Sequence, residues 1–209
     1  MNKPEFLKWE SVLSKEEIHL IDSIYDDMSL DIQIAKMDKH RVQQDARDKI
    51  IKQLKVRPKI LASIAKLSGV NSVVEVGTAQ GMQSVVFSEL FGCKVYTCDI
   101  VDVRDKRAKS DLISFTLGNS VSMSREIQIP FDLAWIDGAH DHYSVVSDFA
   151  ALRKKANANT IWVFDDFDHR FGCFYDISSI AATANESYVI DLGLTGSGQT
   201  NRIMVCKGL

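Results

Sequence analysis

The pattern of hydrophobic and polar positions changes character near residue 70. Before that point, apolar residues recur every three or four positions, which is typical of amphipathic helices. Ser14 and Glu17 have the spacing of a capping box at a helix start, and Gly69 fits the C-cap of the last helix in this part. Residues 41–55 are highly charged, and we expect them to form a solvated helix or a mobile lid.

Short apolar runs alternate with helical patterns in the rest of the chain. The runs predict strands at 72–77, 94–100, 114–118, 132–137, 160–165, 187–194 and 201–206. Helices are expected at about 81–91, 121–126, 142–155 and 172–185, with a short helix rich in Lys and Arg after the second strand.

Repeated strand–helix units predict a parallel sheet with right-handed crossovers. No helix separates the last two strands, so these must pair as an antiparallel hairpin at or near one edge. The predicted fold class is α/β: a three-layer α/β/α, Rossmann-like fold with a mostly parallel seven-stranded sheet, a closing hairpin and N-terminal helices. Residues 1–56 are expected to be a helical extension or lid, and residues 57–209 the ligand-binding domain.

Composition narrows the class of protein. The chain has 209 residues, of which 45% are apolar, enough for one α/β domain with a full core. A net charge of −3 and a pI near 5.9 argue against a nucleic-acid-binding surface. No apolar run is long enough to span a membrane, and the first residues contain no apolar signal core, so we expect a cytoplasmic protein. The cysteines form no CxxC pair, and we expect buried free thiols at Cys93, Cys98, Cys173 and Cys206.

The most informative segment runs from residue 73 to residue 81. A buried strand carrying Glu75 breaks into a turn with Gly77 and Gly81, after which a helix begins. Glycines at such a turn let the backbone approach a nucleotide-like ligand closely. Asp99 ends the next strand and can accept hydrogen bonds from a ribose diol. The alternatives are that Glu75 caps the following helix and that Asp99 is a simple helix N-cap.

Further acids end two later strands. Asp137 follows one apolar run, and Asp165 and Asp166 follow the next. Since adjacent parallel strands end at the same edge of a sheet, these carboxylates could converge on a hard cation such as Mg²⁺ or Mn²⁺. His140 is a candidate general base because histidine titrates near neutral pH. It could instead orient Asp137 or cap the next helix.

The glycine turn, with Gly118-Asn119-Ser120 and the closing hairpin, resembles the class I S-adenosylmethionine-dependent methyltransferases. The resemblance covers about residues 57–208. It implies that the backbone from Gly77 to Gly81 lies against the methionine part of the cofactor. The implied cofactor-binding residues are Glu75, Gly77, Thr78, Ala79, Gly81, Ser84, Asp99, Asn119, Ser120 and Asp137.

The run from Trp135 to His140, followed by Asp165-Asp166, resembles metal-dependent O-methyltransferases, including bacterial sugar O-methyltransferases. This resemblance implies a metal site of Asp137, Asp165 and Asp166, with Mg²⁺ or Mn²⁺ bound. It places His140 where the catechol enzymes have a catalytic lysine. It implies methyl transfer from S-adenosylmethionine to a hydroxyl of a small molecule with vicinal oxygens, a sugar rather than a catechol.

Other interpretations make different predictions. A fold relative could bind the cofactor without transferring a methyl group, as a regulatory or pathway partner. A methyltransferase of nucleic acids is disfavoured, because the chain has neither a Pro-Cys nucleophile nor an Asn/Asp-Pro-Pro motif. A nicotinamide dehydrogenase would require a G-x-G-x-x-G turn. We expect a small-molecule partner and no nucleic acid or membrane, and the long N-terminal helices could form the contact of a homodimer.

Overall fold

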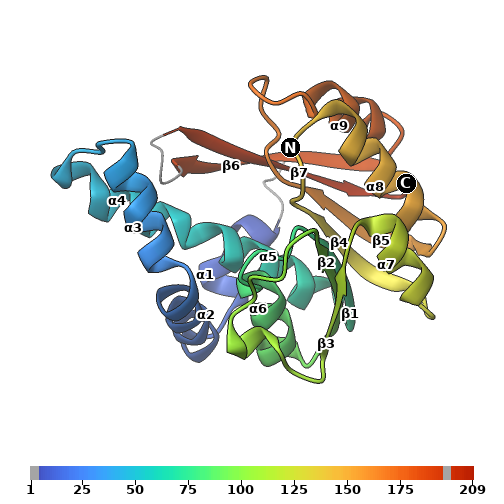
Figure 1. Cartoon of the computed structure of the whole chain (residues 1–209), viewed down its shortest axis with the longest axis horizontal. Coiled ribbons are helices and arrows are strands. Elements are labelled where there is room, and N and C mark those ends of the chain that lie inside the picture. The colour runs from blue at the N-terminus through green and yellow to red at the C-terminus, as the bar shows by residue number, and fades with distance from the viewer. Residues whose placement is uncertain (1–4, 195–198) are drawn as a thin grey trace.

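The computed structural model describes residues 5–194 and 199–209 (Figure 1). Its N-terminal part is helical. The elements before the sheet are η1 (Glu5–Leu7), α1 (Trp9–Val12), α2 (Lys15–Met28), α3 (Leu30–Lys39), α4 (Gln44–Leu54) and α5 (Val56–Ser68). The predicted capping box starts α2, and Gly69 ends α5 with a left-handed backbone, φ +61°.

Strands and helices alternate after α5, as the sequence predicts. The strands are β1 (Ser72–Val76), β2 (Lys94–Asp99), β3 (Ile113–Leu117), β4 (Phe131–Ile136), β5 (Ala156–Phe164), β6 (Glu186–Leu194) and β7 (Thr200–Lys207). The connecting helices are α6 (Met82–Phe91), η2 (Lys106–Ala108), α7 (Ser120–Glu126), α8 (His142–Arg153) and α9 (Phe174–Ala181).

The strands form one sheet in the order β3-β2-β1-β4-β5-β7-β6. The first five strands are parallel, and β7 runs antiparallel to both β5 and β6. The predicted fold class, including the closing hairpin at an edge, is confirmed. Residues 195–198 of the expected hairpin connection lie outside the described residues.

Two hydrophobic cores lie on opposite faces of the sheet, so its central strands are buried on both sides. In β4, Leu133 and Trp135 face the core formed with α2, α5 and α6, whereas Ala134 and Ile136 face the core formed with α7, α8 and α9. Figure 1 shows these two helical layers, with α3 and α4 extending beside the β6–β7 hairpin. In the described part of the chain, no helix is long and apolar enough to cross a membrane.

Some predicted boundaries are wrong in detail. The Lys/Arg-rich helix after β2 is only the three-residue turn η2, which Asp105 caps by accepting from the Arg107 N–H. Helix α9 is shorter than expected at both ends. It starts after a turn in which the Phe171 N–H donates to the Asp168 carbonyl. It ends before Asn185, whose N–H already donates to the Lys207 carbonyl beside β6. All four cysteines are buried and free, as predicted.

Candidate active site

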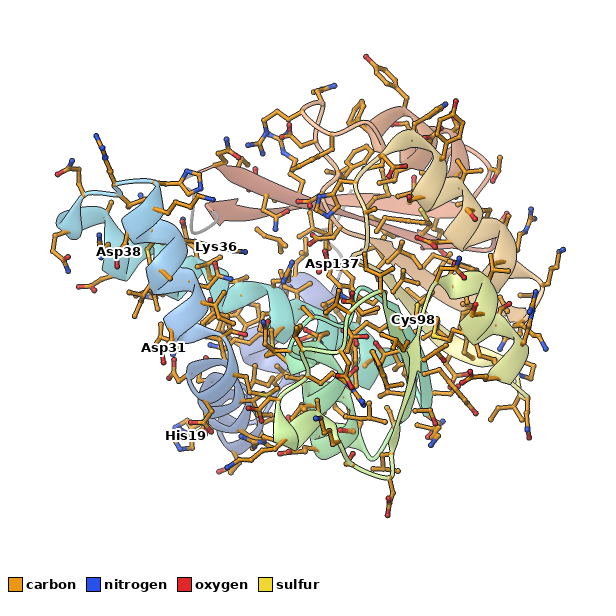
Figure 2. All side chains as sticks on the ribbon, viewed as in Figure 1. His19, Asp31, Lys36, Asp38, Cys98 and Asp137 are labelled. Carbon is orange, nitrogen blue, oxygen red and sulfur yellow. The ribbon has the colours of Figure 1, made fainter. Side chains whose placement is uncertain are left out.

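A cavity of about 770 Å³ opens at the carboxyl ends of the parallel strands, where side chains from distant segments meet. Figure 2 places Asp137 near the middle of the molecule, at this edge of the sheet. Most of the predicted site residues line the cavity: Glu75, Gly77, Thr78, Ala79, Asp99, Asn119, Ser120, Asp137, His140, Asp165 and Asp166. Gly81 and Ser84 are not among the lining residues.

The glycine turn after β1 is shaped by close backbone contacts. Gly77 has φ +91°, and a Cβ there would lie 2.0 Å from the carbonyl oxygen of Asp137. Gly81 has φ +83°, and a Cβ there would lie 2.5 Å from the Cβ of Ala108. Any side chain at Gly77 would therefore push β1 away from the acidic end of β4.

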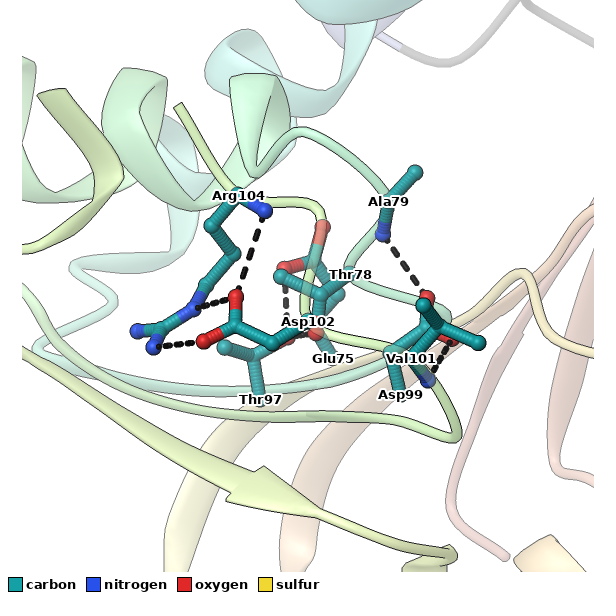
Figure 3. Close-up of polar contacts among 8 residues, drawn as sticks. All are labelled: Glu75, Thr78, Ala79, Thr97, Asp99, Val101, Asp102 and Arg104. Atoms are coloured by element: carbon teal, nitrogen blue, oxygen red, sulfur yellow. Dashed lines mark hydrogen bonds and ion pairs between the residues drawn. The ribbon is translucent and has the colours of Figure 1, made fainter. Parts of the chain in front are cut away.

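Asp99 stabilises the conformation of this turn through a hydrogen bond. Ala79 has a left-handed backbone, φ +46°, although it is not a glycine. Its N–H donates to Oδ2 of Asp99 at 2.9 Å, and the Val101 N–H donates to Oδ1 at 3.3 Å (Figure 3). Asp99 thus holds the turn in its strained form while keeping lone pairs on both oxygens for a ligand.

Glu75 is buried beneath the turn, with 2% of its surface exposed. Thr97 Oγ1 donates to its carboxylate at 2.8 Å, and the Ser84 hydroxyl donates to the same oxygen. Burial raises the pKa of Glu75 to about 7. Ser84 therefore supports the cavity through Glu75. Thr97 was not predicted as a site residue. Its only signal in the sequence is a polar side chain within an apolar strand.

The segment that follows β3 contributes two polar side chains, and both already make hydrogen bonds within the protein. Asn119 Oδ1 caps α7 by accepting from the Ser122 N–H at 3.0 Å. Ser120 Oγ donates to Asp148 at 2.5 Å, and burial raises the pKa of that carboxyl. Both residues still line the cavity, next to Gly118.

Asp137, His140 and Asp166 form the compact group of possible metal ligands. One ligand atom of each lies within 4.8 Å of the other two. His140 Nε2 is 2.8 Å from Asp166 Oδ2 and 3.9 Å from Asp137 Oδ1. Hydrogen bonds to Asp137 and Asp166 raise the pKa of His140 to about 10. Asp166 has a left-handed backbone, φ +51°, which aims its carboxylate into the group.

Asp165 is not one of these three residues, and it pairs with a residue that the sequence analysis missed. Arg57 Nη1 is 2.5 Å from Asp165 Oδ2 and 3.4 Å from Asp137 Oδ2. Burial and the nearby carboxylate of Asp137 raise the pKa of Asp165 well above its ordinary value. The other Asp165 oxygen, Oδ1, is buried without a hydrogen-bond partner. No local pattern at Arg57 could have revealed this contact, because it joins segments 108 residues apart.

The donor set fits a hard divalent cation. Asp137 and Asp166 offer carboxylate oxygens and His140 an imidazole nitrogen, with one ligand atom of each within 4.8 Å of the others, and carboxylate oxygens are the ligands that Mg²⁺ and Mn²⁺ prefer. Neighbouring acids have other roles. Asp141 caps α8, accepting from the Tyr143 and Ser144 N–H groups, and Asp176 pairs with His142 Nδ1 at 2.5 Å.

The N-terminal helices also contribute to the cavity wall. Tyr25 of α2, Gln33 and Lys36 of α3 and Gln53 of α4 line it. The Tyr25 hydroxyl is buried without a hydrogen-bond partner. Residues 41–55, expected as a solvated helix or lid, include α4, which packs against β6. There the Gln53 side chain lies where a Cβ on Gly193 would be.

Comparisons with known proteins agree on the fold. A family model described as a methyltransferase domain matches residues 74–167, and a search of curated protein sequences finds no match. The O-methyltransferase TomG from Streptomyces achromogenes, solved with S-adenosylmethionine, is 14% identical with a TM-score of 0.62, over 95% of this chain and 92% of that one. An O-methyltransferase from Bacillus cereus, solved with S-adenosylhomocysteine, is 15% identical with a TM-score of 0.61, over 99% and 92%.

Proposed function

This chain carries a methyltransferase domain with the class I fold, and from that premise we propose that it methylates a hydroxyl group of a small molecule. The methyl donor would be S-adenosylmethionine, and the acceptor would carry vicinal oxygens. The observation that carries the proposal is the shared cavity, where the glycine turn and Asp99 lie beside Asp137, His140 and Asp166.

The cofactor would lie along the turn after β1. The side-chain-free backbone at Gly77 permits close approach, and Asp99 keeps free lone pairs on both oxygens for the ribose hydroxyls. Glu75, held by Ser84 and Thr97, would support the methionine end from below. This arrangement would present the methyl group toward the end of β4, where Asp137 begins the acidic group.

Asp137 and Asp166 would hold a divalent cation. The sequence prediction adds Asp165 as a third ligand, and the structure adds His140 to the compact group. When bound, such an ion neutralises the carboxylates and makes a coordinated hydroxyl more acidic.

His140 is proposed as the general base. Its side chain is 39% exposed and faces the cavity, and Asp166 orients its ring through Nε2. The edge of the Phe171 ring packs against the imidazole at 5.1 Å between centroids, which limits its rotation. Asp137 and Asp166 raise the pKa of His140 and favour its protonated form; a cation that neutralises these carboxylates would lower that pKa and let His140 accept the acceptor's proton as the oxygen attacks the methyl carbon.

The acceptor would bind on the side of the N-terminal helices. Gln33 and Lys36 of α3 and Gln53 of α4 line that wall, and Thr200 and Asn201 of β7 line the cavity as well; the Asn201 side-chain oxygen is buried without a partner. Several hydrogen-bonding side chains on these walls suit a polyhydroxylated acceptor better than a purely aromatic one.

The test is calorimetric titration of S-adenosylmethionine and S-adenosylhomocysteine, with Mg²⁺ and with a chelator, on the wild type and Asp137→Ala. We expect cofactor binding together with a separate Mg²⁺ signal that disappears in the variant. Cofactor binding with no response to metal would remove the cation from the proposal. Tight cofactor binding without turnover of any diol would favour a binding protein that transfers no methyl group.

A further inference from the structure

Arg57 lies inside the acidic edge of the cavity, although it belongs to the first turn of α5. Its guanidinium Nη1 contacts Oδ2 of Asp165 at 2.5 Å and Oδ2 of Asp137 at 3.4 Å, and the group lies 5.5 Å from the Trp135 ring. The Asp165 side chain is only 3% exposed and the Arg57 side chain 30%, so the carboxylate end of this ion pair is shielded from water.

The guanidinium contacts the carboxylates unequally: it pairs closely with Asp165 Oδ2 and more loosely with Asp137 Oδ2, while the other Asp137 oxygen, Oδ1, lies 3.9 Å from His140 Nε2. A divalent cation on Asp165 Oδ2 would have to share that oxygen with a guanidinium nitrogen 2.5 Å away, against strong repulsion between like charges. Asp137 and Asp166 instead have ligand atoms within 4.8 Å of each other and of His140. Asp165 does not belong to that compact group.

We propose that Arg57 is a positioning residue that decides which carboxylates are available to a divalent cation. It holds Asp165 as its own partner and leaves Asp137 and Asp166, next to His140, for the ion. This inference rests on the metal site of the proposed function, and it removes Asp165 from the ligand set expected from the sequence.

The competing assignment makes Asp165 a direct ligand. Its Oδ1 is buried without a partner, as a ligand oxygen would be before an ion binds. The two assignments differ in how Arg57 and Asp165 are coupled. If the ion pair with Arg57 keeps Asp165 from the cation, removing the charge of Asp165 should change the affinity for the cation little while Arg57 is present. The same change should lower that affinity strongly once Arg57 has been replaced.

The experiment is a Mn²⁺ titration, followed by calorimetry and by the electron paramagnetic resonance of free Mn²⁺, without cofactor or acceptor. The proteins are the wild type, Asp165→Asn, Asp166→Asn, Arg57→Met and the double variant Arg57→Met/Asp165→Asn. We expect Asp166→Asn to weaken Mn²⁺ binding by about tenfold or more and Asp165→Asn by less than about threefold. In the Arg57→Met background, the Asp165→Asn change should cost about tenfold, because the freed carboxylate then binds the ion.

The inference is overturned if Asp165→Asn in the wild-type background weakens Mn²⁺ binding as much as Asp166→Asn does. Arg57→Lys, which keeps the charge, should retain the wild-type ranking of the two Asp variants. If Arg57→Met does not fold by circular dichroism, the ranking in the wild-type and Arg57→Lys backgrounds still decides. A wild type that binds no Mn²⁺ or Mg²⁺ would instead refute the metal half of the proposed function, and this inference with it.

Discussion

Glu75 places a carboxylate where a full charge is unfavourable. It is 2% exposed, and its partners are the hydroxyls of Ser84 and Thr97. Hydroxyl donors stabilise the charged form, but burial outweighs them and raises the pKa to about 7, from an ordinary value of 4.5. The folded protein therefore binds a proton at Glu75 more tightly than the unfolded chain does.

The stability of the protein should reflect this proton. A raised folded-state pKa stabilises the fold fully below about pH 4.5, and that contribution is lost as the pH rises through about 7. We compare the wild type with Glu75→Gln, which resembles the neutral carboxyl. Between pH 4.5 and 8, the free energy of unfolding of the wild type should fall by about 3 kcal/mol relative to the variant. Urea unfolding at several pH values measures this, and parallel pH profiles would contradict it.

At the scale of elements, the start of α2 connects local sequence to tertiary packing. Ser14 Oγ accepts from the Glu17 N–H at 3.2 Å, and the Ser14 N–H donates to Glu17 Oε2 at 2.5 Å. The same Glu17 carboxylate contacts Lys66 Nζ of α5 at 2.6 Å. The capping box therefore also orients the carboxylate that joins α2 to α5.

Ser14→Ala should lower the free energy of unfolding by about 1 kcal/mol, because the Glu17 N–H in the first turn loses its acceptor, Ser14 Oγ. Ser179→Ala is the matched control. Ser179 is exposed within α9, and its hydroxyl only donates to the Tyr175 carbonyl one turn earlier. Alanine favours helix at such a site, so the control should be neutral or slightly more stable. Chemical denaturation of both variants tests this, and equal losses would show that the capping box adds nothing.

At the scale of the whole molecule, the N-terminal helices are part of the main core. Ile21 and Ile24 of α2 are fully buried, and they pack in the same cluster as Val73 of β1 and Val85 of α6. Further along the extension, Tyr25 and Gln53 reach the cavity. The extension thus covers one face of the sheet with its first helices and lines the site with side chains from α2, α3 and α4.

A fragment of residues 57–209 should therefore not fold cooperatively. Each large buried aliphatic side chain contributes about 2–5 kcal/mol, and a domain of this kind is stable by only about 5–15 kcal/mol in total. Removing Leu13, Ile21, Ile24 and Met28 together would cost about 8–20 kcal/mol, as much as the whole margin. Thermal melting followed by near-ultraviolet circular dichroism, with the full chain as control, measures this. A cooperative transition in the fragment would show that the boundary at residue 56 separates an independent domain.

Much of the architecture could be read from local patterns. The confirmed fold class rests on apolar runs of strand length, a glycine turn and a helix-free final connection. These features are local, because backbone sterics and side-chain periodicity act over a few residues. The predicted ends of the helices were less accurate. The limits of α9 depend on hydrogen bonds made by residues 168–171 and by the distant Lys207.

The sequence by itself determined which strands carry acids and where the backbone must remain free of side chains. Acids at the ends of adjacent parallel strands have to share one edge, and the glycines at 77 and 81 mark a turn whose backbone can approach a neighbour closely. Only the tertiary structure decided how those acids are divided. Arg57 reaches Asp165 and Asp137 across 108 and 80 residues, and Thr97 reaches Glu75 from the neighbouring strand. Such contacts depend on the packing of whole elements, which brings a charge into range only after the chain has folded.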